Sequence, residues 1–594
     1  RQGDPLSGYL FIIALELLAQ KIRESPNIQG IKIGSAEHKL AQYVDDLTIF
    51  VRNVDSAKEI FYILELYYKA AGLKVNKDKT EGLWLGRNRL SQDKPLNIKW
   101  PTDPLRILGV YLSYNKDQAD SANFDNKIEK LKRQLHWWKA RDLSILGRIM
   151  IVKSIALSKF AHLAASTKIP TNIVKTINAI IFEFIWKGKR DKVKRDIMVQ
   201  DYNKGGLTMI DVSMVIIASQ LMWVKEYLDP KVTASWKGNL EIFCDVENLR
   251  LCLQSKFSIN ELHDRVPEYY KESLKYWHEY KYCDDSEDYG SRLIWYNTDL
   301  CIADNTVYNQ RLFQCGLWFV KDLYENGNLV PFNIWQKRGA RAKDYLVWRG
   351  IIQCVKNAYG SIDVNDIPKE CLVVCGIQCN DKFMSIVDVN QKFIKNMLRW
   401  VRYEKCNQLL KSQIKYHEKC VLKEEEWQNI YMLAKEIIVD NKTIEMQFKI
   451  LHRIIGTNSF LYKIGKSISP SCHHCEMFTE TIENIFFECI FVKNFWLKVS
   501  ERWNAYTHNE TAISFNCKDM LLGYELQNWK ECVDVNILIM YGKKYIYMCK
   551  MHEKIPEIIS FKHFLQSNLN VLLQTKLSYN TEYRFVMNFI TNFV

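Results

Sequence analysis

The chain contains 594 residues, of which 47 % are hydrophobic and 13 % are aromatic. Its length predicts several domains, and its aromatic content excludes disorder over most of that length. The 82 Lys and Arg residues outnumber the 68 Asp and Glu residues, so the net charge is +14. No run of about 18 apolar residues occurs, and we therefore expect no membrane-spanning helix.

The chain begins at Arg1 instead of Met and shows neither a cationic leader nor a cleavage site. We therefore expect a truncated product, the rear part of a larger polypeptide, located in the nucleus and cytoplasm. The 17 cysteines are an odd number and are scattered along the chain. This pattern indicates reduced thiols and leaves room for a metal site, but it does not fit a disulfide framework.

Residues 1–115 alternate helical and strand patterns, which predicts an α+β unit. The pair Asp4 and Pro5 predicts the start of a helix that runs to about Glu24. The apolar stretch 40–51 predicts two strands on either side of an acidic pair.

A second helix is predicted from a capping-box pair, Ser56 and Glu59, and Gly72 is expected to end it. Two short strand candidates follow at 82–85 and 105–112. The predicted order is therefore helix, hairpin, helix, strand and strand.

The rest of the chain is predicted to be mostly helical. Residues 116–230 are helical and basic, and residues 231–430 are helix-rich, aromatic and nearly neutral. Residues 431–515 contain the only close cysteine cluster of the sequence, and residues 516–594 predict a few terminal helices.

Most of the excess positive charge lies in one segment. Residues 127–195 contain 17 Lys or Arg but only 4 Asp or Glu. A basic field of this kind usually meets a polyanion, so we expect nucleic acid as a partner. The alternative is a solvated helix face, although the acidic residues that would balance such a face are missing.

The most informative stretch is the pair Asp45 and Asp46 between two apolar strands. Adjacent carboxylates in such a setting are costly unless a cation lies between them. A divalent cation removes this cost, and Mg²⁺ prefers one or two carboxylates together with substrate phosphates. The alternative is an exposed Asp-Asp turn, which would explain the dipeptide better if it stood alone.

The neighbouring motifs favour the metal site. They are RQGDPLS at 1–7, YVDD at 43–46, GLKVN and KT within 72–80, and RILGV at 106–110. In this order the sequence resembles the reverse transcriptases of LINE-type (non-LTR) retrotransposons. Those enzymes carry RQGDPLSP, a YADD-like box, GLKVN…KT and a YLG-like segment, so Gly8 and Val44 are mild departures from the family pattern.

The resemblance implies roles for residues of these motifs. Asp45 corresponds to the metal-binding catalytic aspartate, with Asp46 as its partner, in a two-metal magnesium site. Gln2 and Gly3 fall where the family contacts the incoming nucleotide and the template.

Two further roles have open alternatives. Lys79 falls where a polymerase lysine protonates the leaving pyrophosphate, with Lys74 and Lys77 as weaker choices and a solvated surface charge as the alternative. Leu108 and Gly109 resemble the primer-grip hairpin, and the alternative is a plain hairpin core.

The family's first catalytic aspartate lies upstream of the RQGDPLSP segment, at which this chain starts. Asp4 cannot replace it, because a residue at a helix start does not face the acidic hairpin. We therefore expect that residues 1–594 alone do not polymerise, since the metal geometry is incomplete.

Two basic motifs, WWKARDLSILGR at 137–148 and FIWKGKR at 184–190, resemble the region that follows the palm in this family. They are followed by KGGL at 204–207. The resemblance implies a thumb that holds a template–primer duplex by its phosphates. The implied nucleic-acid-binding residues are Lys139, Arg141, Arg148, Lys187, Lys189 and Arg190.

The cysteine cluster comprises Cys472, Cys475 and Cys489. The family often carries a zinc knuckle with the pattern C-x₂-C…H-x₄-C near this place. Asn484 stands at the position of the expected His, and Asn is a poor zinc ligand. His473 or His474 could replace it only awkwardly in so tight a loop, so we expect a degenerate knuckle and leave zinc binding open.

We therefore predict part of a right-hand RNA-directed DNA polymerase with an α+β palm, a helical thumb and a mostly helical C-terminal region. The expected segments are a palm at 1–115, a thumb at 116–230, a connector at 231–430, the cysteine region at 431–515 and a tail at 516–594. The expected partners are an RNA template, a DNA primer or target end and deoxynucleotides, without a membrane. The alternative is a decayed retroelement remnant that only binds nucleic acid.

Overall fold

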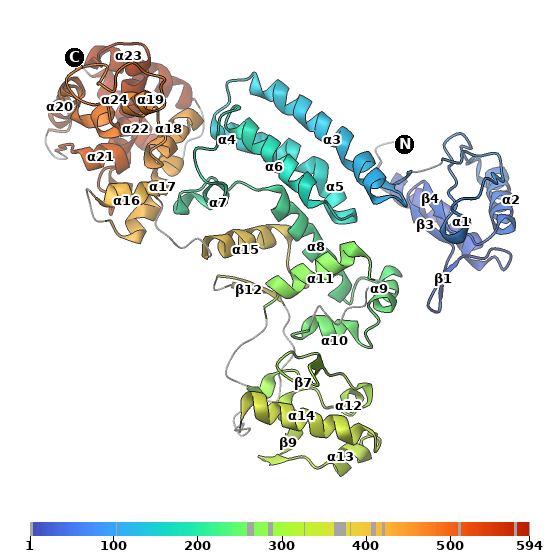
Figure 1. The fold of residues 1–594 in the computed structure, drawn as a ribbon. Coiled ribbons are helices and arrows are strands. Elements are labelled where there is room, and N and C mark those ends of the chain that lie inside the picture. Colours follow the sequence, from blue (N-terminus) through green and yellow to red (C-terminus); the bar gives the residue numbers. More distant parts are fainter. Residues whose placement is uncertain are drawn as a thin grey trace. The chain divides into compact units, whose positions relative to one another are not determined.

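The computed structural model describes residues 4–101, 104–257, 266–282, 289–325, 327–360, 376–380, 382–404, 411–418, 422–508, 512–574 and 579–592. These residues are mainly helical, and their strands form two-stranded antiparallel hairpins (Figure 1). They divide into two compact units. Unit 1 comprises residues 1–131, 160–174 and 215–394, and unit 2 comprises residues 132–159, 175–214 and 395–594.

Each unit is assembled from three separate stretches of chain, and the boundaries fall inside helices. These helices are α3 (Lys116–Lys139), α5 (Ser158–Ser166), α6 (Thr171–Ile185), α8 (Val212–Leu228) and α15 (Gln391–Glu404). The compact units are therefore not consecutive along the sequence, and the division into five consecutive segments stays a prediction.

The first part of unit 1 combines helices with three hairpins. Its elements are α1 (Pro5–Glu24), β1 (Ile31–Ile33), β2 (Ala36–His38), β3 (Leu40–Tyr43), β4 (Asp46–Ile49), α2 (Val54–Ala71), β5 (Leu105–Ile107) and β6 (Val110–Leu112). This mixture of helices and short strands is compatible with the predicted α+β class.

Helix α1 begins where the sequence predicts. The Asp4 carboxylate accepts a hydrogen bond from the Leu6 backbone N–H at 2.8 Å, and Pro5 occupies the first helical position. The helix ends at Glu24, as expected from the following Ser-Pro-Asn. Its buried Leu18 and Ile22 pack with residues of α2 to form a small core.

Helix α2 differs from the prediction at its start. Asn53 caps it, because the Asn53 side chain accepts a hydrogen bond from the Ser56 backbone N–H at 2.8 Å. The hydroxyl of Ser56 instead accepts a hydrogen bond from the Gln29 backbone N–H at 2.9 Å. This buried residue therefore holds the loop before β1 against α2. Gly72 ends the helix with a φ of 72°, as predicted.

The prediction of a strand at 82–85 is wrong, whereas the stretch 105–112 forms the β5–β6 hairpin. Near 82–85 the structure has one isolated bridge, between Glu81 and Lys99. The indoles of Trp84 and Trp100 stack with ring centroids 5.1 Å apart, so aromatic packing organises this loop.

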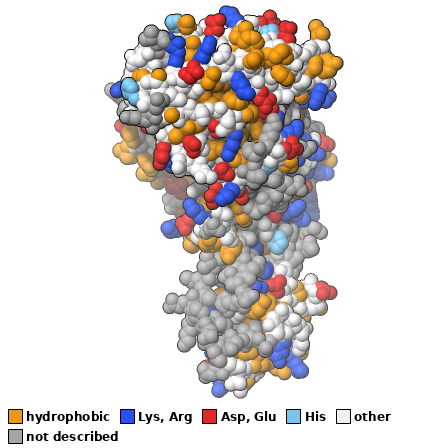
Figure 2. All heavy atoms as spheres, turned by 90° about the vertical axis from the view of Figure 1, so that its left-hand side faces the viewer, with side chains coloured by type: hydrophobic (Ala, Val, Ile, Leu, Met, Phe, Trp, Pro, Cys, Tyr) orange, Lys and Arg blue, Asp and Glu red, His pale blue; other side chains and the backbone are white. Residues whose placement is uncertain are grey.

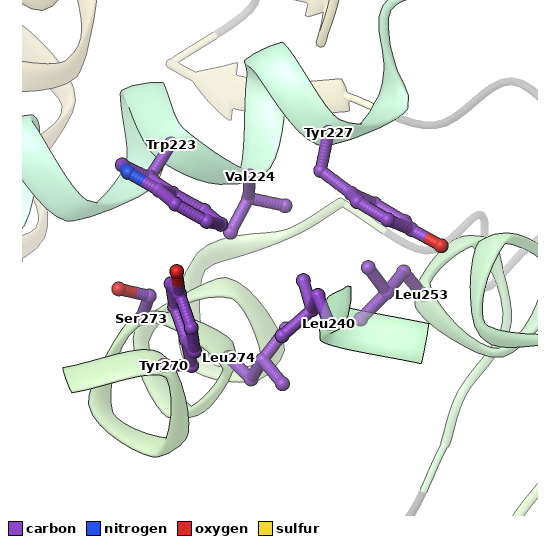
Figure 3. A pocket seen from close by; sticks show the side chains of 8 residues that line it. All are labelled: Trp223, Val224, Tyr227, Leu240, Leu253, Tyr270, Ser273 and Leu274. Carbon is purple, nitrogen blue, oxygen red and sulfur yellow. The ribbon is translucent and has the colours of Figure 1, made fainter. Parts of the chain in front are cut away.

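The middle region of unit 1 packs aromatic residues into a core. Figure 3 shows Trp223 and Tyr227 of α8 opposite Tyr270 and Leu274. The Trp223 and Tyr270 ring centroids are 4.4 Å apart, and the crevice between these elements has a volume of about 10 Å³. This is about the space of one water molecule, so these aromatics serve packing.

The remaining elements of unit 1 are short. The helices are α9 (Trp236–Cys244), α10 (Leu249–Gln254), α11 (Glu268–Tyr280), α12 (Gln310–Gln314), α13 (Phe332–Lys337) and α14 (Asp344–Tyr359). The hairpins are β7 (Cys301–Ile302) with β8 (Asn305–Thr306), β9 (Tyr324–Glu325) with β10 (Asn328–Leu329), and β11 (Gly376–Cys379) with β12 (Lys382–Ser385).

Unit 2 is helical and has its core around α22 (Val533–Met551), which is buried along most of its length. The other complete elements are α4 (Ile145–Ile151), a π-helical turn (Val152–Ala156), α7 (Arg195–Val199), the short turn η3 (Tyr202–Lys204), α16 (Lys411–His417), α17 (Glu424–Ile437), α18 (Asn441–Leu451), α19 (Asn458–Lys463), a second π-helical turn (Asn484–Glu488), α20 (Ile490–Tyr506), α21 (Cys517–Leu522), α23 (Ile558–Leu572) and α24 (Asn580–Thr591).

Helix α1 is the one straight helix among the described residues that is long and apolar enough to cross a membrane. The bent pair formed by 145–156 and α5 would be a second candidate if it were one span. A single such helix does not establish a span, because core helices of water-soluble domains pass the same test; 22 % of the apolar window of α1 is buried. The expectation that no segment spans a membrane therefore stands as a prediction.

A lysine lies in the core of unit 2. Lys543 of α22 is fully buried, and its Nζ donates to the Gln447 side-chain oxygen at 2.6 Å. The Gln447 amide in turn donates to the Leu521 carbonyl at 2.9 Å. Burial lowers the pKa of Lys543 from 10.5 to about 7, because the charged form loses its hydration.

We expect Lys543→Met to reduce the pH dependence of stability. Above pH 7 the folded chain releases a proton that the unfolded chain keeps until about pH 10, so the contribution of Lys543 to stability rises with pH in this window. The free energy of unfolding of the wild type should rise by up to about 1.4 kcal/mol per pH unit relative to that of the variant. Urea unfolding followed by circular dichroism at several pH values measures this gain. Lys498→Met, at an exposed position of α20, is the control, and parallel curves for both variants would contradict the prediction.

Candidate functional site

The acidic pair lies at the tip of the β3–β4 hairpin. The strands pair antiparallel, with Leu40 opposite Ile49 and Tyr43 opposite Asp46, which leaves Val44 and Asp45 as a two-residue turn. Leu40, Leu47 and Ile49 pack against the small core formed by α1 and α2. The hairpin is thus held by one apolar face, and both aspartates are exposed at its end.

The backbone of the turn is in an unfavourable conformation. Val44 has a φ of 54°, which is rare for a β-branched residue and costs about 1–3 kcal/mol. The Gln42 side chain donates a hydrogen bond to the Val44 carbonyl at 3.2 Å and so supports this conformation. Conformations of this kind cluster at functional sites, where the surrounding structure fixes them.

Lys79 lies in a turn that Asn76 organises. The Asn76 side chain accepts hydrogen bonds from the backbone N–H groups of Asp78, at 3.1 Å, and Lys79, at 3.2 Å. Val75 packs on the same core as the hairpin strands, and the side chain of Lys79 is exposed. One core therefore anchors both segments, and the role of Lys79 stays a prediction. Gln2 and Gly3 lie outside the described residues.

Leu108 and Gly109 form the turn of the β5–β6 hairpin. Their φ values of 46° and 83° are those of a type I′ turn, the form that favours tight hairpins. The Leu108 carbonyl accepts a hydrogen bond from His162 of α5 at 2.8 Å. The buried Asn123 of α3 pairs with both the N–H and the carbonyl of Tyr111, each at 2.8 Å. Helices α3 and α5 therefore fix this hairpin in unit 1.

Two basic motifs that are about 45 residues apart in the sequence meet in unit 2. The Lys139 Nζ at the end of α3 lies against the Gly188 backbone in the turn after α6. Asp142 joins them to a third element, since it accepts from Lys187 at 3.5 Å and from Lys442 of α18 at 2.6 Å. These hydrogen bonds lower the pKa of Asp142, that from Lys442 most.

Further lysines join this site from farther along the chain. Lys192 has its pKa lowered first by burial and then by the nearby cations Lys449, Lys189 and Lys466. Local charge counts do not reveal Lys442, Lys449 and Lys466, because their neighbours in the sequence are mixed in charge. We call the combined set the basic surface: Lys139, Arg141, Lys187, Lys189, Arg190, Lys192, Lys442, Lys449 and Lys466.

Arg148 lies inside unit 2 and not on the basic surface. It is 5 % exposed, its Nε donates to the Ile185 carbonyl at 2.7 Å, and one terminal nitrogen donates to the Leu143 carbonyl at 2.5 Å. Its guanidinium thus joins α4 to the end of α6. Because it is not accessible to a phosphate here, we leave Arg148 out of the proposed interface.

A second face of unit 2 has a different character. Figure 2 shows hydrophobic, basic and acidic side chains interspersed on the face where the C-terminal helices are turned toward the viewer. A mixed face of this kind does not produce the one-sided field that attracts a polyanion. The basic surface is therefore the better candidate for contact with nucleic acid.

The three cysteines of the cluster come together. The Sγ atoms of Cys472, Cys475 and Cys489 all lie within 4.8 Å of one another. The Cys472 thiol donates to Cys489, which lowers the pKa of Cys489, and the backbone N–H groups of Phe491 and Val492 at the start of α20 lower it further. The same hydrogen bond, followed by burial, raises the pKa of the Cys472 thiol, so the arrangement favours a thiolate, the form that binds metals, at Cys489.

Two further polar atoms in this segment, His474 Nε2 and Asn484 Oδ1, are buried without a hydrogen-bond partner among the described residues. Burial, followed by the nearby His473, lowers the pKa of His474, so its imidazole is neutral, as a metal ligand must be. Three thiolates and one imidazole nitrogen are a donor set that zinc accepts.

Buried charges hold the cysteine loop in place. Glu480 is 1 % exposed, pairs with Lys550 of α22, and accepts hydrogen bonds from the backbone N–H groups of Asn458, at 2.6 Å, and His473, at 3.4 Å. Such outer contacts orient the ligands of a metal site.

The comparisons with known proteins agree with the motifs. Residues 1–112 match the family described as "Reverse transcriptase (RNA-dependent DNA polymerase)". The chain is also similar to the "Transposon TX1 uncharacterized 149 kDa protein" of Xenopus laevis, with 24 % identity over 287 residues. This similarity covers 47 % of the chain and 22 % of that relative, so the chain matches about a fifth of the relative's length.

The matched residues include the acidic hairpin, the Asn76 turn and the β5–β6 hairpin. The family match and the transposon relative together confirm the resemblance that the motifs indicate. Residues 1–112 thus match the reverse transcriptase family, and the chain resembles a transposon protein.

Proposed function

We propose that the chain is part of an RNA-directed DNA polymerase that copies the RNA of a non-LTR retrotransposon, with a DNA end as primer. The observation that carries this proposal is the pair of exposed carboxylates at the tip of a core-anchored hairpin within the family match. The expected substrates are an RNA template, a DNA primer and deoxynucleotides.

In this proposal Asp45 and Asp46 bind the catalytic Mg²⁺ ions. The two aspartates are consecutive residues at a short turn, and carboxylate oxygens are the ligands that a hard cation prefers. When bound, the ions activate the primer 3′-hydroxyl and stabilise the charge on the leaving pyrophosphate. The β5–β6 hairpin at Leu108 and Gly109 positions the primer end, and Lys79 supplies a proton to the pyrophosphate.

The basic surface holds the duplex by its phosphates. Lysines and arginines from α3, the turn after α6, and α18 converge there, with Asp142 paired to two of them. Contacts to phosphates position a duplex without reading its sequence, as a polymerase requires.

We expect Asp45→Ala to reduce primer extension by about a thousandfold or more, because a metal-ligand carboxylate is lost. RNA binding should be unchanged, since Asp45 contributes no positive charge. Primer extension on an RNA template and filter binding of the same RNA, in a protein that contains residues 1–594, measure the two effects. Asp93→Ala, which removes another exposed carboxylate of unit 1, is the control. Loss of RNA binding together with activity would indicate a structural role for the hairpin.

Extension of a primed RNA template by a protein that contains residues 1–594 would support the polymerase proposal. Binding without extension in every longer form would favour the alternative, a remnant that only binds nucleic acid.

RNA-duplex binding should weaken steeply as salt increases, because phosphate contacts release counterions. Lys187→Ala combined with Lys189→Ala should reduce the slope of log K against log[salt] by roughly 0.9 for each lysine. Fluorescence anisotropy with an RNA duplex over a salt series measures the slope. Lys493→Ala combined with Lys498→Ala, on α20, is the matched control. A flat salt dependence of the wild type would count against the basic surface.

We propose that Cys472, Cys475 and Cys489 bind Zn²⁺, with His474 as the fourth ligand. Cys489→Ser should therefore reduce bound zinc strongly, and His474→Asn should reduce it about tenfold or more in affinity. Asn484→His, which adds the family's usual ligand, should preserve or tighten binding. Metal analysis of the purified chain and competition with a chelating dye measure these effects. Less than stoichiometric zinc in the wild type, restored by Asn484→His, would show instead that the knuckle is degenerate.

A further inference from the structure

A groove in unit 2 lies outside the reverse transcriptase motifs. It is formed by α4 and the π-helical turn on one side and by the end of α17 and the start of α18 on the other. Its volume is about 350 Å³, within the range of ligand pockets. Its lining combines apolar side chains, among them Leu146, Met150 and Ile438, with the two cations Lys153 and Lys435, and each side contributes both kinds.

Lys153 reaches the groove from an irregular part of the helix. The Leu157 backbone N–H bonds to the Val152 carbonyl at 3.0 Å, which makes the π-helical turn that carries Lys153. Such turns are frequent at functional sites. The Lys153 ammonium donates to the Thr208 hydroxyl at 3.0 Å, and an ammonium has three hydrogens to donate.

The groups around Lys153 are mostly cations. Lys435 lies 3.7 Å above the centroid of the Tyr202 ring, and Arg399 donates to the Thr208 carbonyl at 3.3 Å. The Nε of Arg399 is buried without a partner among the described residues. Burial, then Arg399, then Lys435 lower the pKa of Lys153 to about 8. Asp201 opposes these cations, but its side chain is 53 % exposed and it pairs with Arg399 at 3.4 Å.

The residue that joins two of these cations is in an unfavourable conformation. Thr208 has a φ of 51°, although it is β-branched. Its hydroxyl accepts from Lys153 and its carbonyl accepts from Arg399. The preceding turn depends on Gly206, because a Cβ there would lie 2.0 Å from the Gln200 carbonyl oxygen. The fold thus maintains a strained segment that gathers positive charge beside the groove.

An anion with an apolar body suits these surroundings. Glu436 also acts on Lys435, but Lys153, Lys435 and Arg399 outnumber the two carboxylates, and a bound phosphate lowers the cost of placing these cations together. The apolar side chains that line the groove with the lysines offer a surface for a planar group. Proteins bind single-stranded nucleic acid with this combination of a positive groove and an apolar or aromatic platform.

We propose that this groove binds one unpaired nucleotide of a nucleic-acid strand. Its phosphate lies between Lys153 and Lys435, and its base lies against Met150 and Ile438. This inference rests on the proposed function in one respect, namely that the strand is part of the nucleic acid that the proposed polymerase binds. A free nucleotide has the same chemistry, so the experiment distinguishes the two sources.

The test uses the full chain and two fluorescein-labelled probes, an oligouridylate and an RNA duplex of the same length. Lys153→Met and Lys435→Met should each weaken oligouridylate binding about tenfold, the effect of losing one charged hydrogen bond. Duplex binding should change little, because the basic surface is intact. Lys498→Met is the control at an exposed position, and Lys153→Arg should restore binding.

Thermal unfolding of each variant tests for a folding defect. We expect none, because removal of a cation that lies beside other cations should not lower stability. Unchanged oligouridylate affinity in Lys153→Met would overturn the proposal. An equal loss for both probes would overturn it as well, because the lysines would then belong to the duplex surface.

Competition with uridine monophosphate identifies the source of the nucleotide. Displacement of the oligouridylate by the monophosphate, abolished in Lys153→Met, supports a groove that also accepts free nucleotides. Binding of the oligouridylate alone supports a groove specific for a strand. These results are independent of primer extension, so failure of the polymerase proposal at Asp45 and failure of the groove are distinguishable.

Discussion

The apolar anchoring of the acidic hairpin is the constraint on which the candidate active site depends. Leu40, Leu47 and Ile49 fix one face of the hairpin to a core that α1 and α2 share, and the same core holds the segment of Val75. Two consecutive aspartates can then be exposed at the tip, because burial elsewhere determines their position. The strained backbone of Val44 is maintained by the same packing.

Local sequence patterns predicted much of this part of the fold. The Asp-Pro start of α1, the glycine at the end of α2 and the hairpin around the aspartates depend on neighbours in the sequence, and all three are confirmed. The capping-box pattern misled, because it matches many sequences, and Asn53 three residues earlier is the stronger cap. The strand at 82–85 failed for a different reason, since a strand needs a partner and indole packing determines that loop instead.

Functions that depend on distant residues were not predictable in the same way. The sequence indicates a basic field, but it does not show that Lys442 joins Lys187 through Asp142, because these residues meet only in the folded chain. Nor does it distinguish Lys187, which is exposed, from Arg148, whose guanidinium is used to bind two backbone carbonyls. The two differ in burial, and composition contains no information about burial.

In both cationic regions of unit 2 a carboxylate interacts with more than one cation. On the basic surface a single aspartate, Asp142, accepts from two lysines, and beside the groove Asp201 faces Arg399 and its neighbouring lysines. Glu445 pairs with Lys449 on the basic surface and Glu436 lies near Lys435, but in both regions the cations outnumber the carboxylates that order them. Because the side chains are already ordered, binding of a polyanion costs less conformational entropy than it would with free lysines. The chain has 14 more basic than acidic residues, and both regions place some of this excess positive charge in one part of unit 2.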